Sequence, residues 1–463
     1  MVITATAATS DTEDSGQQFS PAHLSSVDAL RGLAAIYVAC FHVIFVPSPP
    51  LAVPGWFRPF MGSGGSGVAL FFVVSAFTLS ISWHSRKEVS HRTRNFYIRR
   101  VFRIVPLFYF LLMLTLVRDW FRFHAIHSVK EILVSVVMLY NLVPGHSGGI
   151  VWASWTIGVE MLFYLMFPLV MKLGSTPVRL VACFVGSLVL AIVFYQGVQH
   201  SHLSQSIKAG VLLTALAVHI PVFVLGIIAY TIFASKRFRQ LRSKWVGGAL
   251  VAVALTIYLT FAYTGMYLGR VGTDWSAPAY AILVLGLVIC PLTPIVNAVT
   301  RFYGRISYSV YLNHPLVIVL LLPVYARIYK FAQWPLLALL SCFAVTLAVL
   351  TPWAYLTYRL IEQPGIRLGS RLIKSLLLST SGCVGAALQG CVGSSLRVSE
   401  PPMAFGQETV GPREPYIEMT RWGVGSFPCL RGETWDTRRP PGRRPCPLIC
   451  QCLSETVAGN LTM

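Results

Sequence analysis

The sequence predicts an all-α integral membrane protein with about ten transmembrane helices. Of its 463 residues, 55% are hydrophobic and 12% are charged, whereas a typical soluble domain carries about 25% charged residues. The mean hydropathy is +0.65, and many apolar runs approach the roughly 20 residues that span a bilayer as a helix. A β-barrel would need alternating apolar and polar residues, and the run from Leu180 to Tyr195 does not alternate.

Ten apolar segments account for the predicted crossings. In chain order they are Val27–Val46, Ser66–Trp83, Ile104–Val117, Trp155–Met171, Val178–Gln196, Gly210–Ala234, Trp245–Tyr263, Ala277–Asn297, Ile306–Tyr325 and Trp334–Tyr358. A further stretch, Ile132–Val143, is short, and runs of about 10–14 residues are more often re-entrant or interfacial than spanning. These segments divide the chain into a polar N-terminal segment (1–26), a membrane domain (27–370) and a C-terminal tail (371–463).

Loop charge predicts the orientation of the helices, because cytoplasmic loops carry an excess of Lys and Arg. With the N-terminus inside, one inner loop carries seven cations between Arg86 and Arg103, and a later one carries five between Lys236 and Lys244. If Ile132–Val143 also crossed, the later cluster would lie outside. We therefore expect that this stretch does not cross and that both termini are cytoplasmic.

The formal net charge of +20 would suggest nucleic-acid binding in a soluble protein. Here the basic residues lie in loops and in the tail, where they fit the topology and contact with anionic lipid headgroups. The sequence contains no nucleic-acid signature and no metal-ligand spacing, so we expect neither partner. Beyond Thr380 the basic tail is rich in Pro, Arg, Gly and Cys, which is typical of disorder.

Ionisable residues in the first predicted helix form one polar stripe. Such residues are costly in a membrane, so each is a candidate functional residue. Arg31 and His42 are 11 residues apart, which places them on one helix face, separated by about 16 Å of rise. Asp28 lies within about 60° of the same face. A hydrogen-bonded core histidine is the alternative for His42 alone, and the stripe favours a functional residue.

Three arginines, Arg99, Arg100 and Arg103, lie in the predicted loop before the third helix. Their planar guanidinium groups suit phosphate, so the segment indicates either anion binding or ordinary positive-inside charge. Glu160 lies at the outer start of the fourth helix, at a depth similar to that of His42. The carboxylate could pair with the imidazole and fix its tautomer, or it could reach water.

A second polar face is predicted in the ninth helix. Ser307, Tyr311 and His314 are spaced as i, i+4 and i+7, which brings them to one side of a helix. Structural hydrogen bonding between helices explains this pattern as well as a functional site does.

Six short motifs occur in a fixed order between Ser26 and Gly369, over some three quarters of the chain. They are Val27–Ala34 with His42 eleven residues after Arg31, Gly67–Phe77, Arg100-x-x-Arg103-x-x-Pro106, Trp155–Glu160 with Phe163-Tyr164 and Pro168, Ile306–His314, and Glu362-Gln363-Pro364. Together they resemble the acyltransferase-3 family of membrane-bound O-acyltransferases, which includes cell-surface polysaccharide acetyltransferases. Ala76 stands where the family usually has Gly, and Trp155-Thr156-Ile157 replaces the usual Trp-Ser-Leu.

The resemblance implies ten helices in a bacterial inner membrane, acyl-CoA as a cytosolic co-substrate, no bound cofactor, and usually a cell-surface carbohydrate or related acceptor. It implies that His42 is the essential base and that Arg31, Arg100 and Arg103 belong to the donor site. Glu160 is a second candidate catalytic residue. The candidate site-lining residues are Asp28, Ser75, Tyr311 and His314, and Ser75 keeps a covalent acyl-enzyme open.

Two other function classes compete with an O-acyltransferase that moves an acyl group, with acetyl favoured. A transporter or flippase of polysaccharide units would use the polar stripe as a substrate path, but transporters often have matching halves, and none is visible here. A membrane anchor with a basic tail would leave the intramembrane His42 and Arg31 unexplained. Binding of acyl-CoA separates the enzyme from both.

Overall fold

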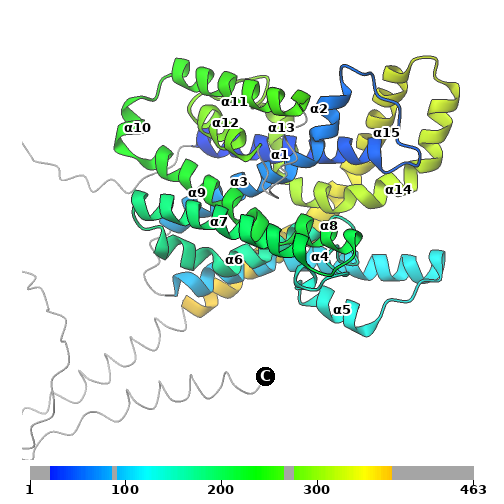
Figure 1. The fold of residues 1–463 in the computed structure, drawn as a ribbon, viewed down its shortest axis with the longest axis horizontal. Coiled ribbons are helices and arrows are strands. Elements are labelled where there is room, and N and C mark those ends of the chain that lie inside the picture. The colour runs from blue at the N-terminus through cyan, green and yellow to red at the C-terminus, as the bar shows by residue number, and fades with distance from the viewer. Residues whose placement is uncertain (1–20, 86–90, 265–275, 378–463) are drawn as a thin grey trace, which may run out of the picture. The chain divides into compact units, whose positions relative to one another are not determined.

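The computed structural model describes residues 21–85, 91–264 and 276–377, and within these ranges the chain is helical and has no strand (Figure 1). This confirms the all-α prediction. The helices are α1 (Pro21–Phe45), α2 (Arg58–Gly62), η1 (Ser63–Ser66), α3 (Gly67–Ser85), α4 (Arg92–Phe123), α5 (Val129–Val136), η2 (Tyr140–Leu142), α6 (Trp155–Leu173), α7 (Pro177–His200), α8 (Gln205–Thr214), α9 (Leu216–Ala234), α10 (Lys236–Gln240), α11 (Lys244–Thr264), α12 (Ala277–Ile289), α13 (Ala298–Arg305), α14 (Ser307–Phe331), α15 (Pro335–Thr357) and the π-helical η3 (Tyr358–Glu362).

The chain divides into two units, residues 1–373 and 374–463. Residues 363–377 continue as helix after η3, so the predicted tail begins within a helix. The remainder of that tail, and most of the predicted N-terminal segment, lie outside the described residues.

The number of crossings differs from the prediction. The described residues contain nine helices that are long and apolar enough to span a membrane, not ten. The difference lies at Ala277–Asn297, where α12 ends at Ile289 after 13 residues, about 20 Å of helix against a hydrocarbon core of about 30 Å. Pro291 and Pro294 interrupt the apolar run, because proline lacks the N–H that a helix interior needs.

The arginine-rich segment before the third predicted span is helical, so the prediction of a loop there is wrong. Helix α4 begins at Arg92, well before Ile104, and carries Arg99, Arg100 and Arg103. Arginine is a good helix former, and a loop prediction based on apolar content alone misses it. By contrast, Ile132–Val143 forms only the eight-residue α5 and the short η2, which are too short to span a membrane.

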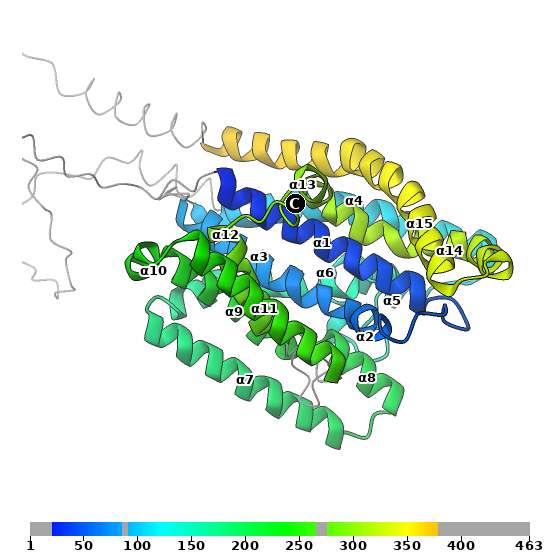
Figure 2. The same cartoon turned by 90° about the horizontal axis from the view of Figure 1, so that it is seen from above.

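The helix ends fall into two groups. Figure 2 shows the beginning of α1 and α10 at one end of the bundle, and α2 and α8 at the other. The first group is called the arginine end, because Arg31 lies in the half of α1 nearer to it and Arg100 lies within electrostatic range of Arg31. The second is called the histidine end, because α1 finishes there soon after His42.

Two glycines set the position of α1 against α13. A Cβ on Gly32 would lie 2.3 Å from the backbone oxygen of Thr300, and a Cβ on Gly304 would lie 1.9 Å from that of Asp28. Only glycine permits such close backbone approach. The contact fixes Asp28 and Arg31 at the arginine end, beside the start of α14.

Candidate active site

His42 forms a hydrogen-bonded pair with His314. The Nδ1 atom of His42, near the end of α1, lies 3.1 Å from the Nε2 atom of His314 in α14. The two ring centroids are 4.9 Å apart. His314 is fully buried, whereas His42 is half-buried. The structure therefore brings together two histidines that the sequence placed on separate polar faces.

Backbone carbonyls assign the protons of this pair. The Nδ1 atom of His42 lies 2.9 Å from the oxygen of Val38, and the Nδ1 atom of His314 bonds to the oxygen of Tyr311. A carbonyl oxygen only accepts, so both Nδ1 atoms carry protons when the rings are neutral. His314 then presents the lone pair of Nε2 to the Nδ1–H of His42, which donates to both Val38 and His314. The Nε2 atom of His42 keeps a free lone pair.

Aromatic rings surround His42 at the histidine end. The Trp152 ring lies 5.8 Å away with the planes at 75°, and the Phe41 ring lies 5.2 Å away at 82°. Trp152 is 47% exposed and belongs to the segment between η2 and α6. His42 is thus the member of the pair that a molecule at this end can reach.

Glu160 does not pair with His42. Its Oε1 atom accepts hydrogen bonds from Ser75 Oγ, at 2.6 Å, and from the Tyr164 hydroxyl. The physical reason is direction: Glu160 lies on α6 facing α3, where two hydroxyl donors satisfy one carboxylate oxygen. His42 instead meets α14. The alternative that Glu160 fixes the tautomer of His42 is therefore not what the structure shows.

The three predicted donor-site arginines gather around the Glu160 network. Arg31 lies within electrostatic range of Arg103, Glu160 and Arg100, and the Arg100 guanidinium lies 5.5 Å from the centre of the Tyr164 ring. Among the described residues, the Nε atoms of Arg31 and Arg100 are buried without a hydrogen-bond partner. Buried charged donors of this kind normally have a partner, so the cluster is suited to an anionic ligand.

A cavity of about 50 Å³ lies between Arg31 and Tyr311. Arg31, Ser75, Glu160 and Tyr311 line it, from α1, α3, α6 and α14. Tyr311 accepts a hydrogen bond of 3.0 Å from Thr156 Oγ1, and its ring lies 5.4 Å from that of His314. The lining thus runs from Arg31 to Tyr311, the residue whose ring lies beside His314.

Sequence reasoning missed the buried carboxylate of Glu362 as a site residue. Glu362 lies in η3, is 1% exposed, accepts a 2.8 Å hydrogen bond from Ser309 Oγ and lies within electrostatic range of Arg103 and Arg31. Asp28 is likewise in range of both arginines. Glu362 opens one of the six motifs. The motif alone does not mark it as a candidate site residue, because its burial near the arginines becomes visible only in the folded chain.

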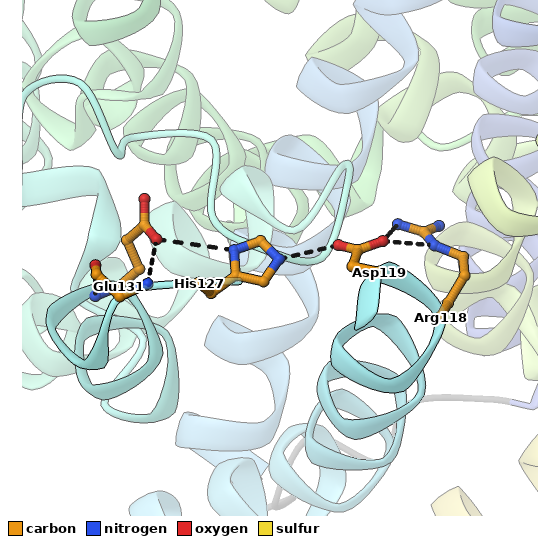
Figure 3. Close-up of polar contacts among 5 residues, drawn as sticks. Arg118, Asp119, His127 and Glu131 are labelled. Carbon is orange, nitrogen blue, oxygen red and sulfur yellow. Dashed lines mark hydrogen bonds and ion pairs between the residues drawn. The ribbon is translucent and has the colours of Figure 1, made fainter. Parts of the chain in front are cut away.

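A second histidine cluster joins the last turns of α4 to α5, and Figure 3 shows its contacts. The Nε2 atom of His127 lies 3.0 Å from Asp119 Oδ2, and Arg118 pairs with the other oxygen of Asp119 at 2.6 Å. Glu131 lies 3.8 Å from His127 and 3.0 Å from His146. No pattern singled out these residues, because they come from α4, α5 and two connecting segments.

The nine long apolar helices of the described residues indicate a multi-pass membrane protein. The model of the acyltransferase-3 family, described as an acyltransferase domain, matches residues 24–353. The chain belongs to this family, and it is an acyltransferase that transfers groups other than aminoacyl groups.

Curated relatives are distant. ORF330 of Acidianus two-tailed virus is 24% identical over 291 residues, which cover 62% of this chain and 81% of that protein. Exopolysaccharide production protein ExoZ of Rhizobium meliloti is 27% identical over 266 residues, covering 55% and 77%. Peptidoglycan O-acetyltransferase OatA of Listeria monocytogenes is 26% identical over 167 residues, covering 33% of this chain but only 24% of OatA. No solved structure matches the chain.

Proposed function

We propose that this acyltransferase moves an acetyl group from cytosolic acetyl-CoA to a hydroxyl group of a cell-surface carbohydrate. The observation that carries the proposal is the state of His42. Its Nδ1 proton is held by Val38 and His314, so Nε2 is left as a base on the one ring of the pair that is only half-buried. The protein would lie in the cell membrane, a bacterial inner membrane by the family resemblance, with both termini cytoplasmic.

The arginine end supports a phosphorylated donor. Arg100 and Arg103 would bind the phosphates of CoA, with Arg31 beside the cavity that leads inward. Guanidinium groups bind phosphate oxygens in pairs, and the unpartnered Nε atoms of Arg31 and Arg100 would gain acceptors. The pantetheine arm would then extend along the cavity toward Tyr311 and the histidine pair.

The reaction follows from the free lone pair of His42. Nε2 removes the proton from an acceptor hydroxyl, and the oxygen attacks the thioester carbonyl carbon. The C–S bond breaks, the acetyl group stays on the acceptor oxygen, and the CoA thiolate takes the proton from His42. General-base catalysis of this kind typically contributes about 10²–10⁴-fold, and positioning of the two substrates adds to it.

The choice of a carbohydrate acceptor draws on the relatives. OatA is named for peptidoglycan O-acetylation, and ExoZ for exopolysaccharide production. Trp152, half-exposed beside His42, offers an aromatic surface at the end where such an acceptor would enter.

Release of CoA tests the proposal. Purified protein in nanodiscs receives acetyl-CoA, and free thiol is followed for the wild type and for His42→Ala. His200→Ala is the matched control, because His200 also bonds through Nδ1 to the carbonyl four residues earlier but lies at the end of α7. We expect slow hydrolysis that falls at least about 100-fold in His42→Ala and is unchanged in His200→Ala. Equal rates in a folded His42→Ala sample, or a wild type that neither hydrolyses nor binds acetyl-CoA, would overturn it.

A further inference from the structure

We propose that His314 is the positioning residue of the reaction: its Nε2 lone pair holds the Nδ1–H of His42, which orients the base and stabilises its protonated form. The inference rests on the proposed role of His42 as the base. It assigns to a neutral imidazole the task that a carboxylate performs in a serine-protease triad.

The hydrogen bond between the two rings runs from His42 to His314. His314 already donates from Nδ1 to the Tyr311 carbonyl, so its Nε2 is the acceptor of the 3.1 Å contact with His42 Nδ1 when both rings are neutral. His42 therefore always presents Nε2 as its basic nitrogen. A base held in one tautomer spends no time in the unreactive one.

His314 also stabilises the imidazolium that forms when His42 takes the proton. The imidazolium that forms carries a stronger Nδ1–H donor than the neutral ring. That donor already points at the His314 lone pair and at the Val38 oxygen, so the new charge meets two acceptors without rearrangement. Preorganised acceptors of this kind stabilise charge at the moment it develops.

His314 itself cannot turn easily. It is 0% exposed, and its neighbour Tyr311 is hydrogen-bonded to Thr156 of α6. A buried residue of α14, whose neighbour Tyr311 is bonded to α6, thus orients a ring on α1. The bland alternative is an ordinary interhelical hydrogen bond that only stabilises the bundle, and the two roles differ in what a conservative variant restores.

The test compares His314→Leu, His314→Gln and a structural control. Leucine removes the acceptor, whereas the Oε1 atom of glutamine can accept near the position of Nε2. Tyr325→Phe is the control, because it removes a buried 2.6 Å hydrogen bond from α14 to Thr346 of α15. We expect kcat for thiol release to fall about 100-fold in His314→Leu, with KM for acetyl-CoA within about threefold and recovery of about tenfold or more in His314→Gln. The control keeps kcat within about twofold.

A spectroscopic measurement keeps this inference separable from the proposed function. In ¹⁵N-histidine-labelled protein, we expect a through-hydrogen-bond coupling between the ring nitrogens of His42 and His314, which disappears in His314→Leu. If the wild type shows this coupling but releases no CoA, the proposed function is refuted, whereas the hydrogen bond between His42 and His314 is confirmed. A His42-dependent wild type with an equally fast His314→Leu would overturn the role of His314, as would a glutamine variant no faster than leucine.

Discussion

The imidazole rings of two histidine clusters in this protein are hydrogen-bonded to different kinds of partner. In the spanning helices, His42 meets another imidazole and a backbone oxygen. At the end of α4, His127 meets Asp119 at 3.0 Å and lies near Glu131. The side chain of His127 is 23% exposed, whereas His314 is fully buried.

The difference follows from the cost of burying charge. A carboxylate taken out of water loses solvation that an ion pair often fails to return, so a pair such as His127–Asp119 suits a position near the solvent. Two neutral imidazoles joined by N–H donors satisfy their hydrogen bonds without that loss. A search for a functional histidine by its nearest carboxylate would therefore select the cluster around His127 and overlook His42.

The largest effect that sharpens this comparison is expected at Glu160. If Glu160 were the partner of His42, Glu160→Gln would cost about 10⁴-fold, as in a triad with the wrong tautomer. The carboxylate instead bonds to Ser75 and Tyr164, and glutamine keeps an acceptor for both hydroxyls. We expect a loss of about tenfold in kcat for thiol release, caused by the lost negative charge beside Arg31 and Arg100. A loss equal to that of His42→Ala would contradict the conclusion that His42 works without a carboxylate partner.

Most of the spanning helices and the polar stripe on α1 could be predicted from the sequence, because both depend on local spacing. Apolar runs predicted most of the long helices, and the 11-residue spacing placed Arg31 and His42 on one face. The partner of His42 could not be predicted, since His314 lies 272 residues further along and only packing of α1 against α14 unites them. The predicted pairing of Glu160 with His42 rests on depth alone, and depth does not say which way a side chain points.

Two errors in the fold also have local causes. The predicted crossing Ala277–Asn297 includes Pro291 and Pro294, which a helix interior does not accommodate. The charged segment from Arg92 is predicted to be a loop, although arginine propagates a helix well. Composition therefore located the membrane segments, and backbone chemistry decided where the helices begin and end.

A smaller effect is expected at His127, and it is on stability instead of rate. His127→Ala removes the 3.0 Å contact to Asp119, and Asp119 keeps its bond to Arg118. Partly exposed pairs of this kind contribute at most about 1 kcal/mol, so we expect Tm to fall by about 2 °C while thiol release stays within about twofold. Thermal unfolding and the CoA assay measure both. A rate loss comparable to that of His42→Ala would join the two clusters into one site.

The smallest effect concerns the acid sensitivity of Glu131 at the start of α5. The backbone N–H of Ser128 donates to Glu131 Oε2 at 2.9 Å, and this bond holds the pKa of the Glu131 carboxyl below its usual 4.5. A carboxyl whose pKa is lower in the folded state than in the unfolded state stabilises the fold at pH values above its unfolded-state pKa. That contribution is lost as the pH falls through the folded-state pKa. The contribution should therefore be full above about pH 4.5 and fade below it.

Comparison of wild type with Glu131→Gln between pH 6 and pH 3 isolates this contribution. Glutamine keeps an acceptor for the Ser128 N–H but loses the charge that favours a helix N-terminus, an effect of about 0.3–1 kcal/mol. We expect the wild type to be slightly more stable at pH 6, by about 1 °C in Tm, with the difference vanishing toward pH 3. A difference that stays constant over this range would show that the carboxylate charge of Glu131 does not stabilise α5.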